Sequence, residues 1–169
     1  GNRYYARYTL NAKEAEFEYK SLDEVLALSD VVTIHVPYMP ETHHLINKNN
    51  IGKIKKGALL INTSRGPVVE TEALVDALKS GNLGGAGLDV LEEEGVTKDE
   101  MSFLYSTDKT EHNIKTVIAN HILIDMPNVL ITPHNAFNTW EALQRILNTT
   151  IENIAGFKNG QVVNEVKKK

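Results

Sequence analysis

The sequence predicts an α/β domain built on a doubly wound parallel sheet. Short apolar runs rich in β-branched residues alternate with segments of helical periodicity along the 169-residue chain. These runs are continuous instead of alternating with polar residues, which is typical of parallel strands that helices cover on both faces. With 41% hydrophobic residues, a chain of this length can bury the core of one domain.

The alternation of helix and strand begins near residue 21. Ser21 and Glu24 have the spacing of a capping box, so a helix is expected over residues 22–28. A β-branched run over residues 31–36 predicts a strand buried on both faces, and a proline ends it. A second helix is expected near residues 47–55, before the next strand.

The same order of elements continues toward the C-terminus. A strand over residues 58–62 precedes a helix over 71–80, which Gly81 ends as a left-handed cap. The remaining expected elements are a strand at 86–90, a helix at 113–120, a strand at 129–132, and a long helix opened by the capping spacing of Asn138 and Glu141. One apolar stripe of that helix is formed by Leu143, Leu147, Ile151 and Ile154.

Composition and charge exclude several classes of protein. The formal net charge of -4 gives no basic surface for nucleic acid, and the lysines at 167–169 are interpreted as a solvated tail. The lack of cysteine removes disulfides and thiolate chemistry and fits a reducing compartment. No apolar run reaches the roughly 20 residues that span a bilayer, and no signal peptide is visible. We therefore expect a soluble cytoplasmic protein that binds neither nucleic acid nor membrane.

Three charged side chains follow three separate predicted strands: Arg65, Glu94 and His134. Ligands of an open parallel sheet bind in the crevice outside the carboxyl ends of its strands, so these side chains can meet there. A guanidinium at that edge can grip a carboxylate with two hydrogen bonds, and an imidazole oriented by a carboxylate can transfer a proton. The pattern is typical of an active site.

Each of these side chains also has a structural interpretation. Arg65 can pair with a helix end, Glu94 can be one solvated charge of the acidic run 92–94, and a lone histidine is more often structural than catalytic. The functional interpretation of Glu94 requires contact with His134. The other histidines, among them a pair at 43–44 interpreted as surface residues, lack the spacing of metal ligands, so no metal site is expected.

Four ordered motifs together resemble the D-isomer-specific 2-hydroxyacid dehydrogenase family over nearly the whole chain. The motifs are His35-Val36-Pro37 with Glu41-Thr42 and Leu45-Ile46-Asn47, then Ile61-Asn62-Thr63-Ser64-Arg65-Gly66, then Gly87-Leu88-Asp89-Val90 through Glu94, then Asn128-Val129 through Thr132-Pro133-His134. The resemblance implies a Rossmann-like cofactor domain and hydride transfer between NAD(P) and a D-2-hydroxy acid/2-oxo acid pair. It also implies a homodimer formed through the cofactor domain.

The resemblance also implies roles for individual residues. Arg65 is similar to the arginine that binds the substrate carboxylate and keto oxygen, His134 to the acid/base that protonates the keto oxygen, and Glu94 to its carboxylate partner. The positions that the family places at the cofactor are Val36, Pro37, Thr42, Thr63, Ser64, Arg65, Asp89 and His134. Among them, Asp89 lies by the nicotinamide carboxamide.

The sequence departs from the family at its phosphate loop and its substrate domain. No G-x-G-x-x-G loop joins a strand to a helix, because the glycine-rich run 84–87 opens a strand instead. We therefore expect a fragment, with residues 1–136 as a partial NAD(P)-binding domain from its second strand onward. Residues 137–169 are expected to be a helix and tail that return to the substrate domain. Alone, the chain is expected to be inactive and to bind nucleotide weakly.

Two interpretations remain open for the cofactor, and two for the class of function. NAD-selective members carry an acidic residue at the end of the second strand, where this chain has Arg7. Arg7 can meet the 2'-phosphate of NADP or be a solvated charge, so NAD and NADP both stay open. The alternative to an enzyme is a catalytically inactive binding or assembly module, like the corepressors that share this fold.

Overall fold

The computed structural model describes residues 4–5, 18–95 and 114–165. The chain divides into two compact units, Gly1–Pro133 and His134–Lys169, and each is described by itself. Of the elements in the described residues, the first unit holds the strands and most of the helices, and the second holds one long helix with the segments that flank it.

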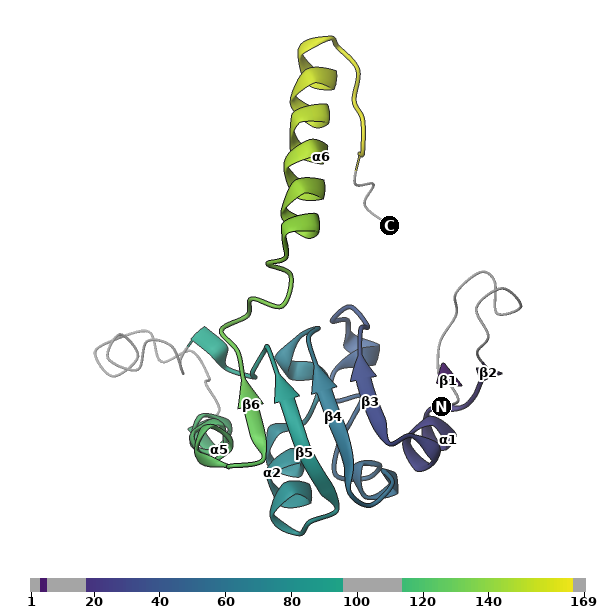
Figure 1. The fold of residues 1–169 in the computed structure, drawn as a ribbon, viewed down its shortest axis with the longest axis vertical. Helices are drawn as coiled ribbons and strands as arrows, with labels where there is room; N and C mark the ends of the chain where they lie inside the picture. The colour runs from purple at the N-terminus through teal and green to yellow at the C-terminus, as the bar shows by residue number, and fades with distance from the viewer. Residues whose placement is uncertain (1–3, 6–17, 96–113, 166–169) are drawn as a thin grey trace. The chain divides into compact units, whose positions relative to one another are not determined.

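The first unit is built on a four-stranded sheet in which every neighbouring pair is parallel (Figure 1). Its strands follow chain order: β3 (Val31–Ile34), β4 (Ala58–Asn62), β5 (Leu83–Leu88) and β6 (Val129–Ile131). A separate parallel pair is formed by β1 (Tyr4–Tyr5) and β2 (Glu18–Tyr19). The predicted α/β class with a parallel sheet is confirmed.

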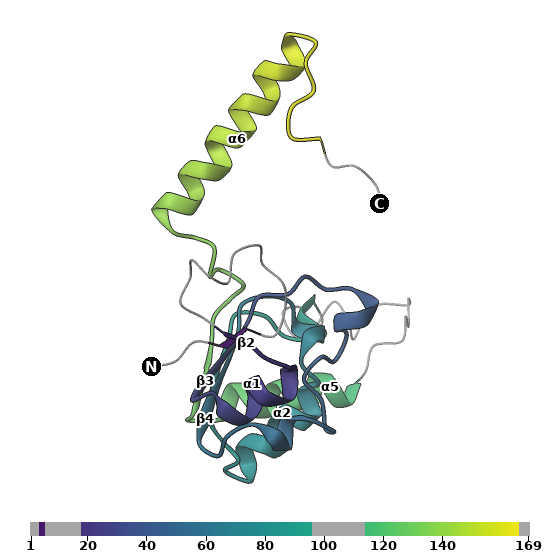
Figure 2. The same ribbon diagram turned by 90° about the vertical axis from the view of Figure 1, so that its right-hand side faces the viewer.

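Helices connect successive strands through the parallel crossovers that such a sheet requires. The described α-helices of the first unit are α1 (Leu22–Leu28), α2 (Thr71–Lys79) and α5 (Ile114–Asp125). Three 3-10 helices, η1 (Pro40–Thr42), η2 (Ile51–Lys53) and η3 (Gly66–Val68), lie in the connections. Helices α2 and α5 pack beside each other on one face of the sheet, and the core lies beneath them (Figure 2).

The core is apolar because alternate residues of each strand point toward these helices. Leu60 and Leu88 of the sheet are buried in one cluster with Leu74 of α2 and Leu123 of α5. Burying each leucine stabilises the fold by about 1.5–3 kcal/mol relative to leaving it exposed. The core therefore fixes the sheet against α2 and α5, and the ends of the strands are held in place.

The opposite face of the sheet is exposed, which contradicts the prediction that the first of these strands is buried on both faces. Val31 is 53% exposed and Leu59 is 42% exposed, whereas Val32 and Leu60 beside them are buried. A β-branched run identifies a strand but does not tell whether another element covers its second face. The sequence therefore predicted the strand correctly and one of its faces wrongly.

The helix predicted over residues 47–55 is also wrong, since only the short η2 forms there. Asparagine side chains take the main-chain groups that a helix would use. Asn50 accepts a bond from the Asn47 amide at 2.8 Å and donates to the Leu45 carbonyl at 2.8 Å. Asn47 in turn donates to the His44 carbonyl. Such local bonds compete with helix formation and favour turns.

Other predicted boundaries agree closely with the structure. Ser21 and Glu24 form the reciprocal capping box at the start of α1. Gly81 has φ of 71° beyond the end of α2, so the left-handed cap is confirmed. Strand β5 begins three residues before its predicted start, and α5 runs past residue 120 to Asp125.

The second unit consists of α6 (Trp140–Lys158) and a short return of the chain. Thr139 caps α6 by accepting a bond from the Ala142 amide, one residue later than the predicted cap. The predicted apolar stripe is present, and its members are 36–65% exposed. Beyond Gly160, Asn164 donates to Asn153 at 2.9 Å, so the tail doubles back along the helix. In the described part of the chain, no helix has both the length and the apolar character to cross a membrane.

Candidate functional site

The carboxyl ends of β3, β4 and β5 lie at the same edge of the sheet because the strands are parallel (Figure 1). The segments that leave this edge begin at residues 35, 63 and 89, and they carry most of the residues singled out in the sequence. Three of these residues are Val36, Ser64 and Asp89. Their contacts show how the edge is built.

The loop after β4 is organised by Asn62, which is 1% exposed. Its side chain accepts a bond from the Ser64 amide at 3.0 Å and donates to the Arg65 carbonyl at 3.0 Å. Both bonds hold the main chain in a tight turn that sends the Arg65 side chain outward. Arg65 is exposed, and its Nη1 donates to the Ser64 carbonyl at 2.7 Å. Thr63 is exposed as well.

The loop after β3 is joined to the loop after β4 by Ser64, whose hydroxyl donates to the Val36 carbonyl. Thr42, which is buried, closes this loop from its other end. The Thr42 hydroxyl contacts the Pro37 carbonyl at 2.7 Å and accepts a bond from the Met39 amide at 2.8 Å. Val36, Pro37, Thr42 and Ser64 therefore form one hydrogen-bonded arrangement, in which the Thr42 hydroxyl is used to shape the loop.

Asp89 lies between the ends of β4 and β6. It is 4% exposed, its amide donates to the Asn62 carbonyl at 2.9 Å, and its Oδ1 accepts a bond from the Thr132 hydroxyl at 2.5 Å. These hydrogen bonds replace those that the buried side chain and amide would otherwise make to water. Asp89 is thus a buried polar group held in a fixed position at the carboxyl edge of the sheet.

The segment that carries Glu94 packs directly on the loop that carries Arg65. A Cβ built on Gly66 would lie 2.1 Å from the Leu91 carbonyl carbon, so the two main chains touch where Gly66 has no side chain. Glu94 itself is half-buried, and Glu93 before it has φ of 50°, in the left-handed region. The segments that carry Arg65 and Glu94 therefore lie against each other at Gly66.

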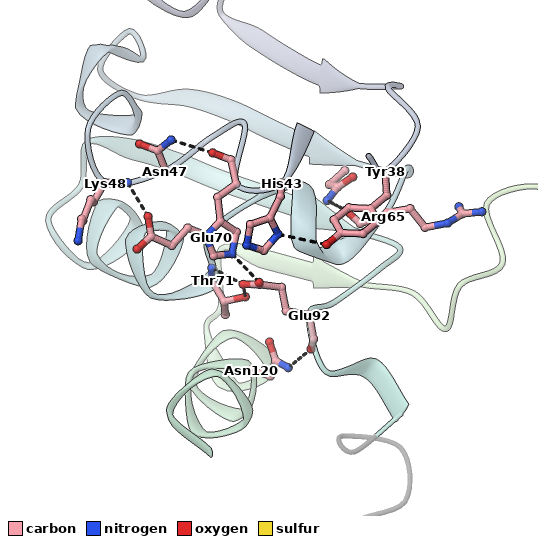
Figure 3. Close-up of polar contacts among 11 residues, drawn as sticks. Tyr38, His43, Asn47, Lys48, Arg65, Glu70, Thr71, Glu92 and Asn120 are labelled. Carbon is pink, nitrogen blue, oxygen red and sulfur yellow. Dashed lines mark hydrogen bonds and ion pairs between the residues drawn. The ribbon is translucent and has the colours of Figure 1, made fainter. Parts of the chain in front are cut away.

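Sequence reasoning missed Glu92, the first residue of the acidic run. Its side chain is 11% exposed, and its carboxylate accepts bonds from the Thr71 amide at 2.8 Å and the Thr71 hydroxyl at 2.6 Å (Figure 3). The other oxygen is hydrogen-bonded to His44 Nε2 at 2.7 Å. The interpretation of both histidines at 43–44 as surface residues is therefore wrong for His44, which is half-buried. No spacing in the sequence links residue 44 to residue 92, so only the fold reveals the pair.

Two predicted residues are not placed against this edge. His134 opens the second unit, where its φ is 54°, so its contact with Glu94 stays a prediction. Arg7 lies outside the described residues. Within residues 4–5, 18–95 and 114–165, no group of three His, Cys, Asp or Glu side chains is arranged to bind a metal ion.

Comparison with known proteins decides the family. Residues 2–136 match the model of the D-isomer specific 2-hydroxyacid dehydrogenase, NAD binding domain. The chain belongs to this family. The resemblance predicted from the four motifs is confirmed, and so is an NAD-binding domain of Rossmann-like fold.

Individual dehydrogenases of the family are similar over most of this chain. A D-specific alpha-keto acid dehydrogenase of Enterococcus faecalis is 45% identical over 148 residues, which are 88% of this chain and 43% of that protein. A glyoxylate reductase of Thermofilum pendens is 40% identical over 92% of this chain and 40% of its own length. The D-lactate dehydrogenase of Aquifex aeolicus, solved with NAD and lactic acid, has a TM-score of 0.75 and 38% identity. That likeness covers 93% of this chain and 45% of the solved one.

The chain spans less than half the length of the dehydrogenases that it matches. Residues 2–136 are the part of it that matches the NAD-binding domain. The edge built by Asn62, Ser64 and Asp89 lies within this matched domain.

Proposed function

We propose that this chain is a large part of the cofactor domain of an NAD-dependent D-2-hydroxyacid dehydrogenase. The reaction interconverts a 2-oxo acid and a D-2-hydroxy acid. The observation that carries the proposal is the edge at which exposed Arg65 stands beside buried Ser64 and Asp89, in a domain of this family. We further propose residues 1–136 as the cofactor domain and residues 137–169 as the segment that returns to a substrate domain.

The residues at the edge fit the nicotinamide half of NAD. The main chain at Val36 and Pro37 is held by the hydroxyls of Ser64 and Thr42, and exposed Thr63 stands beside it. Asp89 supplies a buried carboxylate that can accept a bond from the carboxamide. When bound as NADH, the cofactor supplies the hydride that reduces C2 of the 2-oxo acid. We infer that Val36, Pro37, Thr42, Thr63, Ser64, Arg65, Asp89 and His134 lie around it.

Arg65 is the proposed anchor of the substrate. Two hydrogen bonds from Asn62 fix the adjoining main chain, while the guanidinium itself is exposed and directed away from the core. A guanidinium can bind both oxygens of a carboxylate and also stabilise the negative charge that develops on the neighbouring keto oxygen. Arg65 therefore contributes both to binding the 2-oxo acid and to lowering the barrier of its reduction.

His134 and Glu94 are the proposed proton-transfer pair. Reduction of the keto group needs one proton at the developing alkoxide, and an imidazole can deliver it near neutral pH. A carboxylate partner favours the protonated imidazole and orients the ring. Glu94 leaves the sheet edge on a segment that packs against Gly66, and His134 follows the segment that leaves β6. The left-handed φ of 54° at His134 supports the role, since such backbone conformations cluster at functional sites.

The second candidate function is a catalytically inactive, corepressor-like module that binds a peptide. Arg65 and Asp89 favour the enzyme, because a peptide groove does not require a guanidinium and a buried carboxylate at the nicotinamide end of the edge. Use of NADP through Arg7, a homodimer and a cytoplasmic location stay predictions from the resemblance.

The test is an assay of the longer protein that we propose contains this chain. NADH and NADPH oxidation is followed at 340 nm with glyoxylate, pyruvate, and branched and aromatic 2-oxo acids, each against a reaction without the acid. We expect oxidation that depends on the 2-oxo acid. Binding of NAD without turnover on any of these acids would contradict the enzyme and favour the inactive module.

A further inference from the structure

We propose that Glu92 is a positioning residue that fixes the segment bearing Glu94 at the edge of the sheet. The inference rests on the role proposed above for Glu94, and it adds a residue that does not itself contact the substrate. Glu92 stands two positions before Glu94 and is held by contacts to several other parts of the first unit (Figure 3).

The side chain of Glu92 is fully engaged. One carboxylate oxygen accepts bonds from the amide and the hydroxyl of Thr71, at 2.8 and 2.6 Å, and the other lies 2.7 Å from His44 Nε2. Thr71 is the first residue of α2, and its preceding residue provides no side-chain cap. Glu92 thus supplies, from another segment, the negative charge that the start of a helix favours. Because both of its oxygens are hydrogen-bonded, the Glu92 carboxylate holds its segment in place and does not take part in the reaction.

The main chain of Glu92 is held as firmly as its side chain. Its carbonyl accepts a bond from Asn120 Nδ2 of α5 at 2.7 Å, and a Cβ on Gly66 would lie 2.4 Å from its amide nitrogen. With Thr71 and His44, these contacts fix Glu92 from α2, α5, the turn after η1 and the start of η3. Each of these elements packs into the core, so the position of Glu92 is set by the rigid part of the domain.

The backbone next to these contacts adopts a conformation that needs support. His44 has φ of 48° and Glu93 has φ of 50°, both in the left-handed region that side chains disfavour. Such residues persist where surrounding contacts over-determine them. The bonds to Glu92 stabilise the turn at Glu93, and this turn sets the direction in which Glu94 leaves the chain.

The inference is tested first on the 169-residue chain itself. Amide hydrogen exchange is measured in Glu92→Ala, in Glu92→Gln and in Glu70→Ala as a matched control. Glu70 also accepts a main-chain bond near the start of α2, but from Lys48, so it does not contact the Glu94 segment. We expect Glu92→Ala to speed exchange at residues 92–95 on the order of tenfold, because buried hydrogen bonds are lost. Glu92→Gln keeps an acceptor for Thr71 and should exchange more slowly than Glu92→Ala, and Glu70→Ala should match the original chain in this segment.

The second experiment measures the steady-state kinetics of the same three variants in the longer dehydrogenase that we propose contains this chain. Displacing a catalytic group by about 1 Å costs up to roughly 100-fold in rate, so kcat should fall 10- to 100-fold in Glu92→Ala. The KM for NADH should change less than about twofold, since the loops at Val36 and Ser64 keep their bonds, and Glu92→Gln should recover much of kcat.

Two results would overturn the inference: unchanged exchange at 92–95 in Glu92→Ala, or faster exchange there with kcat as in the unmodified enzyme. If the unmodified protein shows no NADH oxidation with any of the 2-oxo acids, the proposed function fails on its own. The exchange arm then still decides whether Glu92 holds the segment.

Discussion

Gly66 lies against the peptide that joins Leu91 to Glu92, so closely that a Cβ at position 66 would meet the Leu91 carbonyl carbon at 2.1 Å. The neighbour is main chain and cannot rotate away as a flexible side chain can. Arg65 stands just before this contact and Glu94 just after it. The spacing of the two site segments therefore depends on the absence of one side chain.

Gly66→Ala should destabilise the first unit by about 1–3 kcal/mol, the usual cost of forcing extra atoms into a packed site. Urea unfolding of the chain measures the change. The control is Gly52→Ala, because a Cβ there meets no atom within 4 Å and Gly52 has no left-handed φ. That variant should stay within about 0.5 kcal/mol or gain stability. Equal losses in both variants would show that the Gly66 contact is not tight.

Ser64→Ala should cost about 1–2 kcal/mol of unfolding free energy, since the Val36 carbonyl loses its donor in a largely buried place. The loop after β3 should loosen, and NAD should bind more weakly to the dehydrogenase. Chemical denaturation and calorimetry with NAD are the two measurements. Ser80→Ala is the matched control, because that hydroxyl also donates to a carbonyl but lies exposed at the end of α2, so a change within about 0.5 kcal/mol is expected. A Ser64→Ala variant as stable as the Ser80→Ala variant would show that the hydrogen bond from Ser64 to the Val36 carbonyl does not stabilise the fold.

The hydrogen bonds from Ser21 lower the pKa of the Glu24 carboxyl, the side-chain bond first and the main-chain bond second. A folded pKa below the unfolded value means that this contribution to stability is present above the unfolded pKa. It is lost as the pH falls through the folded pKa. In an NMR titration, Ser21→Ala should raise the pKa of Glu24 part of the way to its ordinary value, because the main-chain bond remains. An identical pKa in both proteins would contradict the capping box.

The sequence was sufficient for the parts of the fold that local chemistry decides. The capping box at Ser21 and the left-handed glycine at position 81 act over a few residues, and both boundaries are confirmed. The helix predicted over residues 47–55 does not form, because four hydrogen bonds of asparagine side chains outweigh the weak helical preference of the segment. The prediction that the strand at Val31 is buried on both faces was wrong for a different reason. Whether a sheet face is covered depends on elements far away in the chain.

The parts of the candidate site that lie at strand ends could be predicted from the sequence. Contacts between side chains that are distant in the sequence could not. Arg65 and Glu94 follow predicted strands, so their common edge could be inferred from the α/β pattern, whereas Asp89 was named only through the family resemblance. The bond between His44 and Glu92 joins residues 48 positions apart and has no sequence signal. The role of Asn62 was likewise missed, because a buried asparagine at the end of a strand looks the same in sequence whether or not it organises a turn.

The measurement that tests the central claim most directly is kcat/KM for a 2-oxo acid in the dehydrogenase and in its Arg65→Ala variant. Arg65 is exposed, so its loss should leave the unfolding free energy nearly unchanged. We predict a loss of about 2–5 kcal/mol in transition-state stabilisation, the range found when one partner of a charged contact is removed. Arg65→Lys should recover only part of it, because an ammonium cannot bind both carboxylate oxygens in the same plane. An Arg65→Ala variant with unchanged kcat/KM would contradict the account.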